Sequence, residues 1–203
     1  MHISEGVLSA PVWAGGACAT AAGVAYGLRR TDYDRIPQVA VLSSAFFVAS
    51  LIHVPIGPSN AHLVLNGLAG LLLGWAVFPA VFVGLVLQAI LFQFGGLTTL
   101  GINTVNMALP GLICYFLFGR WVRGENGTRA LAAAFLCGSV SVFLSALMTA
   151  LALVSTGEAF TTVSRLLVVA HVPVMVVEGI LTAFCVRFLR RVKPEILEVP
   201  HAM

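Results

Sequence analysis

The first two residues, Met1-His2, have the types and spacing of a metal chelator. The terminal amine, the His2 amide nitrogen and the His2 imidazole can close a five-membered and a six-membered ring around one ion. Three nitrogens in a plane need one further donor, and square-planar nitrogen sites suit Ni²⁺, Cu²⁺ or low-spin Co²⁺. The alternative is that His2 is a solvated terminal residue that binds nothing.

His62 is the predicted fourth nitrogen donor. It follows a turn-forming run at 57–61 and is expected in the first turn of a helix. The positive end of the helix dipole disfavours imidazolium there, and neutral imidazole is the form that binds metal. The alternative is a histidine that only caps a membrane helix. His53, earlier in the chain, is a weaker candidate for a ligand or a supporting group.

Other polar residues are candidates for supporting roles. Ser59 and Asn60 belong to the turn before His62, and Asn103 and Asn106 belong to a glycine- and asparagine-rich segment at 95–107. Such groups can hold a loop over a metal or orient a ligand histidine. Ordinary turn formation and helix packing explain them equally well.

His171 and Glu178 are seven residues apart in the last apolar run and therefore share one helix face. A glutamate deep in a membrane span is costly unless it is protonated or has a partner. Contact with a partner subunit, a proton-linked role and an internal hydrogen bond with each other remain open explanations.

The composition is that of a membrane protein. Of 203 residues, 59% are hydrophobic and 9% are charged, whereas charged residues make up about 25% of an average soluble domain. The apolar runs are continuous and do not alternate with period two, which favours helices. We predict an all-α membrane protein, one domain over 1–203, with about seven transmembrane helices. The predicted spans are 8–28, 36–54, 62–76, 78–94, 102–119, 130–154 and 166–189.

The segment 62–94 decides the number of spans. As one helix it would be about 50 Å long, which exceeds a hydrocarbon core of about 30 Å. We therefore predict a hairpin of two short spans that turns near Gly74-Trp75 and Pro79.

Basic residues indicate the topology. With seven spans, three basic groups share one side of the membrane, and an excess of arginine and lysine marks the cytoplasmic side. The N-terminus is then outside, and the tail 190–203 is cytoplasmic. The groups are Arg29, Arg30 and Arg35; Arg120, Arg123 and Arg129; and Arg187, Arg190, Arg191 and Lys193.

Two glycine pairs, Gly23–Gly27 and Gly70–Gly74, allow helices to approach closely. Packing inside this chain and docking onto another membrane subunit both explain them. The four cysteines lie in apolar runs without paired spacing, so we predict packing roles for them.

Some functions are disfavoured. We expect no secretory signal, because residues 1–7 carry no basic n-region. The phosphate-binding pattern GxxxxGK[ST] is absent, so uphill transport would need energy from an ion gradient or another polypeptide. The net charge of +3 comes from arginines in loops and indicates topology instead of nucleic-acid binding.

Four segments resemble the CbiM/NikM family, the substrate-binding membrane components of energy-coupling-factor (ECF) transporters for cobalt and nickel. The likeness spans nearly the whole chain, its most specific part is the N-terminal Met-His together with G-P-S-x-x-H-L, and it is closer to the cobalt branch. The segments are MHISEG at 1–6, GPSNAHLVLNGL at 57–68, GGLTTLGINTVNM at 95–107 and HVPVMVVEG at 171–179.

The resemblance implies a seven-helix fold with the N-terminus inserted into the bundle from outside. It implies a metal held by the Met1 amine, the His2 amide and imidazole, and the His62 imidazole, with 1–7 as the chelating segment. It also implies a prokaryotic cell (inner) membrane and a set of partners. These are the lipid bilayer, a transmembrane coupling (T) subunit, ABC-type ATPase subunits and a small accessory membrane protein of the CbiN type.

The sequence thus predicts a non-catalytic capture subunit of a Co²⁺ importer that feeds cobalamin biosynthesis, with Ni²⁺ as the alternative cargo and no catalytic cofactor. An intramembrane hydrolase using Ser59 and His62 at one helix start is a competing reading, although no third catalytic residue is evident. A passive channel or structural membrane subunit is a third reading, in which the N-terminal amine has no role.

Overall fold

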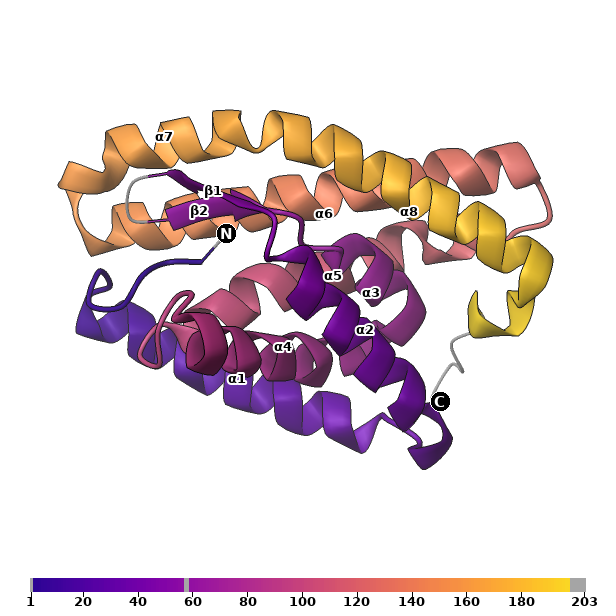
Figure 1. The fold of residues 1–203 in the computed structure, drawn as a ribbon, viewed down its shortest axis with the longest axis horizontal. Coiled ribbons are helices and arrows are strands. Elements are labelled where there is room, and N and C mark those ends of the chain that lie inside the picture. Colours follow the sequence, from indigo (N-terminus) through magenta and orange to yellow (C-terminus); the bar gives the residue numbers. More distant parts are fainter. Residues whose placement is uncertain (1, 57–58, 198–203) are drawn as a thin grey trace.

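The computed structural model describes residues 2–56 and 59–197 of the chain, with the backbone alone described at 53–56 and 59–61. Helices dominate it, and one small hairpin of strands lies among them (Figure 1). The elements are α1 Ala10–Arg29, η1 Tyr33–Arg35, α2 Ile36–Ala49, β1 His53–Ile56, β2 Ser59–His62, α3 Asn66–Leu73, η2 Gly74–Ala76, α4 Val77–Phe92, α5 Leu100–Val122, α6 Gly127–Thr156, η3 Glu158–Phe160, α7 Thr161–Ala170, α8 Val172–Val192 and η4 Pro194–Leu197.

Helix α5 is the centre of the bundle, because it packs against α1, α3, α4 and α6. Its inner residues Met107 and Leu112 are buried in the main hydrophobic core. Helix α2 packs on α4 at one side, and α8 packs along α6 at the other (Figure 1). The apolar runs of the sequence therefore become helices that bury one face against α5 or its immediate neighbours.

Helix α3 runs in the same direction as α5. At the start of α3, Asn66 Nδ2 donates a hydrogen bond to the Met107 carbonyl at 3.0 Å. Just beyond its end, the ring of Trp75 lies 6.4 Å from the ring of Phe116, farther along α5. Gly74 then takes a positive φ of 56°, a conformation that glycine adopts at little cost.

Helix α4 returns in the opposite direction. Gln88, near its end, contacts His2, and the next residue, Ile3, is hydrogen-bonded to Asn103 near the start of α5. The end of α4 therefore lies near the start of α5. The chain reverses within 62–94, and these contacts agree with the predicted hairpin.

Four runs within the described part of the chain are long and apolar enough to cross a membrane, so the predicted count of seven spans remains a prediction. The predicted helix over 62–76 is wrong at its start, because α3 has only eight residues and all are buried. Eight residues rise about 12 Å, less than half of a hydrocarbon core. The four runs are Asn66–Phe92, Leu100–Val122, Gly127–Thr156 and Glu158–Val192.

Strands β1 and β2 pair antiparallel, with His53 opposite His62 in the register. Val54 and Ile56 are β-branched, which favours an extended backbone. Placing His62 in the first turn of a helix was wrong, because Leu65 takes a left-handed conformation with φ 52° and α3 begins only at Asn66. The predicted second span, 36–54, is also too long, because α2 ends at Ala49 and the chain enters strand β1 at His53.

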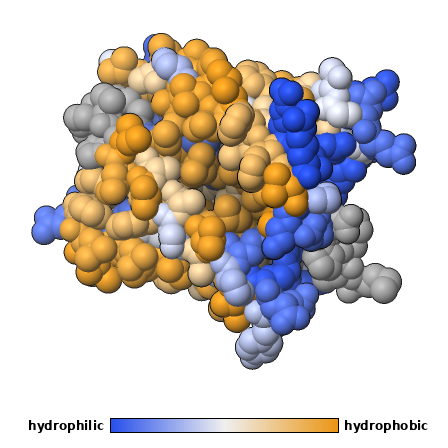
Figure 2. Space-filling view, turned by 45° about the vertical axis from the view of Figure 1, so that its right-hand side comes forward, coloured by the Kyte–Doolittle hydropathy of each residue, from blue (hydrophilic) through white to orange (hydrophobic). Residues whose placement is uncertain are grey.

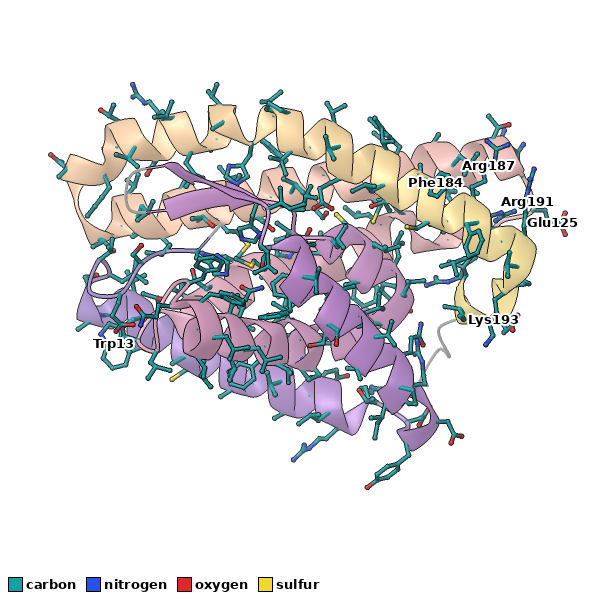
Figure 3. The ribbon with its side chains drawn as sticks, in the orientation of Figure 1. Trp13, Glu125, Phe184, Arg187, Arg191 and Lys193 are labelled. Carbon is teal, nitrogen blue, oxygen red and sulfur yellow. The ribbon has the colours of Figure 1, made fainter. Side chains whose placement is uncertain are left out.

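The basic groups gather at one end of the bundle. Arg35 Nη2 donates to the Leu72 carbonyl at 2.6 Å, and Arg190 Nη1 donates to the Val122 carbonyl at 2.6 Å. These contacts join the first loop, the end of α3, the end of α5 and the end of α8. Figure 3 labels three more basic side chains at this end: Arg187, Arg191 and Lys193.

The outer surface is suited to lipid. In Figure 2, hydrophobic residues cover a broad part of the visible face, and hydrophilic residues gather at one end. Large apolar side chains on this surface include Phe184 on α8 and Val41 on α2, exposed by 69% and 68%. Exposed apolar area of this extent fits a bilayer, where it costs nothing to leave uncovered by protein.

The glycine pairs serve packing inside this chain. A Cβ on Gly70 would overlap the Gly111 carbonyl of α5, and one on Gly23 would overlap the Phe78 ring of α4. A Cβ on Gly27 would lie 2.6 Å from the Trp75 carbonyl oxygen. Of the two explanations for these pairs, the structure supports internal packing.

Gly70→Ala should destabilise the protein by about 1–3 kcal/mol, because the added methyl group meets main chain that cannot move aside. Gly15→Ala is the matched control, since nothing lies within 4 Å of a Cβ built there. The midpoint of thermal unfolding in detergent measures both. Equal midpoints for the two variants would contradict the α3–α5 contact.

Candidate metal centre

The N-terminal segment enters the bundle in an extended form, and His2 and Ile3 are buried. Asn103 holds this segment at both main-chain groups of Ile3. The Ile3 N–H donates to Asn103 Oδ1 at 2.9 Å, and Asn103 Nδ2 donates to the Ile3 carbonyl at 3.1 Å. The Glu5 N–H donates to the Gly95 carbonyl at 3.1 Å. Buried main-chain groups need such partners, so this arrangement allows a polar strand of chain inside the protein.

The His62 ring has a defined protonation state. Its Nδ1 lies 2.7 Å from the Leu63 carbonyl oxygen, which can only accept a hydrogen bond. The proton is therefore on Nδ1, and the lone pair is on Nε2. That Nε2 atom is buried and has no hydrogen-bond partner among the described residues. This is the state in which imidazole ligates a metal.

The His2 ring stacks on the His62 ring. Their centroids are 4.6 Å apart and their planes are inclined by 23°. His2 Nε2 lies 2.5 Å from Gln88 Oε1, an oxygen that accepts, so Nε2 carries the proton and Nδ1 carries the lone pair. A six-membered chelate ring through the His2 amide nitrogen requires Nδ1. With the Gln88 amide in this orientation, the His2 ring has the tautomer that the predicted chelate needs.

Burial keeps His62 neutral. The largest cause of its lowered pKa is desolvation, and the neighbouring imidazoles of His2 and His171 act in the same direction. The helix dipole predicted from the sequence is not the cause, because α3 begins four residues later. The His62 imidazole is nevertheless expected to be neutral, as the sequence predicted.

Glu178 of α8 holds the loop that follows His62. The Val64 N–H donates to Glu178 Oε1 at 2.5 Å and the Leu65 N–H donates to the same oxygen at 2.8 Å. The carboxyl group is fully buried. Hydrogen bonds to a carboxylate are stronger than those between neutral groups. Glu178 is therefore a positioning residue for the His62 loop.

An internal hydrogen bond between His171 and Glu178 was one of the open explanations, and the two side chains, both fully buried, bond to other groups instead. His171 Nδ1 bonds instead to the Leu167 carbonyl at 2.7 Å, and Glu178 bonds to the loop after His62. The helical path is interrupted at His171, where α7 ends and α8 begins.

The structure places the remaining predicted residues in different surroundings. Asn103 bonds to the N-terminal segment, in agreement with the predicted supporting role. Asn106 is buried, and its Nδ2 has no hydrogen-bond partner. Ser59 and Asn60 lie in β2 and His53 in β1, and Met1 is outside the described residues. The hydrolase reading loses its premise, since Ser59 and His62 share a strand and not a helix start.

Sequence reasoning overlooked Gln88. It is a fully buried polar residue in the apolar run of α4, and a polar residue inside a membrane span is a functional candidate by default. That signal was present in the sequence. Its contact with His2 was not predictable, because 86 residues separate the two positions.

No three His, Cys, Asp or Glu side chains converge on one point within 2–56 and 59–197. His2 and His62 supply two imidazoles, so a transition-metal site here needs nitrogen from the main chain as well. The Met1-His2 start offers such nitrogens, an amine and an amide.

Glu178→Leu should lower the stability of the protein by about 2 kcal/mol or more, because two main-chain N–H groups lose their acceptor. Glu178→Gln keeps an acceptor oxygen and should cost less. Glu158→Leu, at an exposed glutamate of η3, is the control for the loss of a carboxylate. Thermal unfolding in detergent compares the three. A Glu178→Leu variant as stable as the control would show that the loop does not depend on this carboxylate.

Comparisons with known proteins agree with a transport role for this fold. A family model described as "Cobalt uptake substrate-specific transmembrane region" matches residues 2–196. A protein of Haemophilus influenzae named as a metal transport protein is 40% identical over 97% of this chain and 97% of its own. A cobalt transport protein CbiM of Sorangium cellulosum is 33% identical over 98% of this chain and 95% of its own.

The fold is also that of a solved structure. The crystal structure of a transition metal transporter has a TM-score of 0.77 and 24% identity, covering 95% of this chain and 93% of that chain. At this identity the likeness establishes the fold alone.

Some relatives are fused to further parts. A fused nickel transport protein NikMN of Archaeoglobus fulgidus is 29% identical over 98% of this chain and 68% of its own. A fused cobalt transport protein CbiMQ of Methanocorpusculum labreanum is 30% identical over 97% of this chain and 36% of its own. The relatives are bacterial and archaeal, and the apolar helices are those of a multi-pass prokaryotic membrane protein.

The family model matches nearly the whole length of the chain. The chain therefore belongs to the CbiM family of cobalt uptake substrate-specific transmembrane regions.

Proposed function

We propose that this protein captures Co²⁺ outside the cell, as the substrate-binding subunit of an ECF-type importer, and that it has no catalytic activity itself. The observation that carries the proposal is the buried His2–His62 stack, in which each ring has the tautomer that a chelate requires. The family's description and the relative named for cobalt transport support the cargo. Cobalamin biosynthesis is the process that such an importer would supply.

The proposed donors are four nitrogens. They are the Met1 amine, the His2 amide, His2 Nδ1 and His62 Nε2. Because the two rings face each other in the stack, binding requires them to turn until Nδ1 of His2 and Nε2 of His62 point at one ion. A rigid nitrogen site of this kind rejects Mg²⁺ and Ca²⁺, which prefer oxygen ligands at higher coordination.

Ni²⁺ is the alternative cargo. It suits square-planar nitrogen sites as well as low-spin Co²⁺ does, and two fused relatives are named for nickel transport. One of them is 39% identical over 55% of this chain, so identity does not separate the two cargoes. The family's description names cobalt uptake, and we therefore put cobalt first.

The proposed orientation follows from charge. The basic end of the bundle faces the cytoplasm by the positive-inside rule, and the His2–His62 end then faces outside.

The fused relatives support the proposal that this protein works with accessory parts of the CbiQ and NikN types. A transmembrane coupling subunit, ABC-type ATPases and a CbiN-type membrane protein complete the proposed importer.

Adding one alanine before Met1 tests the chelate. It moves the free amine away from the His2 amide and should abolish retention of Co²⁺ by the purified protein. Placing a cleavable extension before Met1 and then removing it should restore retention, which controls for folding. Unchanged retention in the extended protein would refute the chelate.

His62→Ala should lose Co²⁺ while the protein still folds, because the fourth donor is gone. His201→Ala, in the predicted cytoplasmic tail, should retain it fully. Metal analysis of both purified variants and thermal unfolding of the metal-free forms provide the measurements. Full occupancy in His62→Ala would require a different fourth donor.

Co²⁺ affinity should fall steeply as the pH falls. Below an amine pKa of about 7.7–8.0, each bound ion displaces one proton from the amine and one from the amide. The affinity should therefore drop about 100-fold per pH unit there, and about tenfold per unit above it. His62 adds no proton in this range, because burial lowers its pKa. Titrations at several pH values measure the slope, and a flat profile would contradict main-chain coordination.

A further inference from the structure

A second imidazole lies near the proposed metal site. His171 is fully buried where α7 ends and α8 begins. Its Nδ1 donates to the Leu167 carbonyl at 2.7 Å, so the lone pair is on Nε2. That Nε2 atom is buried, and no group within the described part of the chain bonds to it. A polar atom in this state inside a protein calls for a ligand or partner.

His171 repeats the local arrangement of His62. In both residues Nδ1–H is tied to a main-chain carbonyl at 2.7 Å, and Nε2 is buried and unsatisfied. Helix α7, which leads into His171, contacts both strands of the hairpin that carries His62.

We propose that His171 is a second metal-binding imidazole, which takes the ion from His62 when the N-terminal chelate opens. The inference rests on the proposed function. When the chelate opens, the bonds from the metal to the Met1 amine, the His2 amide and His2 Nδ1 break, and water molecules replace these donors. The bond to His62 Nε2 then breaks as a bond to His171 Nε2 forms. The Met1 amine and the His2 amide regain from water the protons that they lost on binding, and the metal stays divalent throughout.

The geometry favours successive binding over simultaneous binding. No three His, Cys, Asp or Glu side chains converge within the described ranges, so His171 does not join His2 and His62 around one ion in this conformation. An imidazole that is close but outside the chelate is placed to receive the ion after the chelate.

The face of α8 that follows His171 suggests the direction of travel. Glu178 and Thr182 lie seven and eleven residues later, which puts them on the same helix face as His171. Glu178 Oε2 and Thr182 Oγ1 are buried and have no hydrogen-bond partners. Oxygen atoms bind these metals more weakly than imidazole does. Metal binding by these donors therefore becomes weaker from His171 toward the basic end of the bundle, where Figure 3 labels Arg187 and Arg191.

His171→Asn is the sharpest variant for a test. An asparagine amide can still donate to the Leu167 carbonyl, whereas it has no atom at the position of Nε2. The full-length protein with the alanine extension provides the background, because the primary chelate is disabled there. Co²⁺ binding is followed by visible absorption, and thermal unfolding shows that each variant folds.

The extended protein should lose its Co²⁺ on purification and still bind added Co²⁺ weakly, at His62 and His171 in turn. Adding His171→Asn should weaken that binding by about tenfold or more, the scale expected when a metal site loses a donor or its support. His201→Ala in the same background should change nothing. With the native N-terminus, His171→Asn should leave loading at saturating Co²⁺ intact and slow the release of Co²⁺ to a chelator.

The two proposals fail in different comparisons. If the extended protein binds Co²⁺ as tightly as the native one, the chelate is wrong. If His171→Asn leaves both the residual binding and the release rate unchanged, His171 does not contact the metal and the inference is overturned. If it abolishes loading in the native protein, His171 is a primary ligand and the successive step is wrong.

Discussion

The burial of a polar main-chain segment is the constraint on which the site depends. An extended segment inside a membrane protein carries N–H and C=O groups that no helix satisfies, and each needs a partner. Asn103 satisfies both groups of Ile3, and Gly95 satisfies the Glu5 N–H. With these partners in place, His2 lies against His62, Gln88 and Phe94. The loop before α5 and the first turn of α5 thus bind the start of the chain.

A second buried group sets the other half of the site. The Glu178 carboxyl group accepts hydrogen bonds from the N–H groups of Val64 and Leu65. Leu65 has a left-handed conformation, and His62 lies at the end of a strand. A buried carboxyl group is costly unless it is well bonded, so its cost is offset only while α8 and the His62 loop remain together. The position of the proposed metal ligand and the position of α8 are therefore linked.

The sequence was informative where a helix is long and apolar, and misleading where tertiary contacts overrule local pattern. Helices α1, α5 and α6 lie close to their predicted ranges, because continuous apolar runs of that length can only be satisfied as helices. The strand at His62 was missed, since the turn and the apolar run after it read as a helix start. The loop after His62 is bonded to Glu178, more than a hundred residues away, a contact that no local pattern reveals. His2 and His62 could be paired from their chemistry, whereas Gln88 needed the fold.

Rigidity and freedom are distributed unequally around the site. Helix α3 is wholly buried, and its glycine contact with α5 leaves no room for sliding. Helix α8 has large apolar side chains on its outer face, including Phe184 and Phe188, and is interrupted at His171. Packed cores have discrete arrangements and resist gradual deformation. A shift of α8 therefore acts on the His62 loop through the two Glu178 hydrogen bonds, while α3 and α5 hold the loop that binds the start of the chain in place.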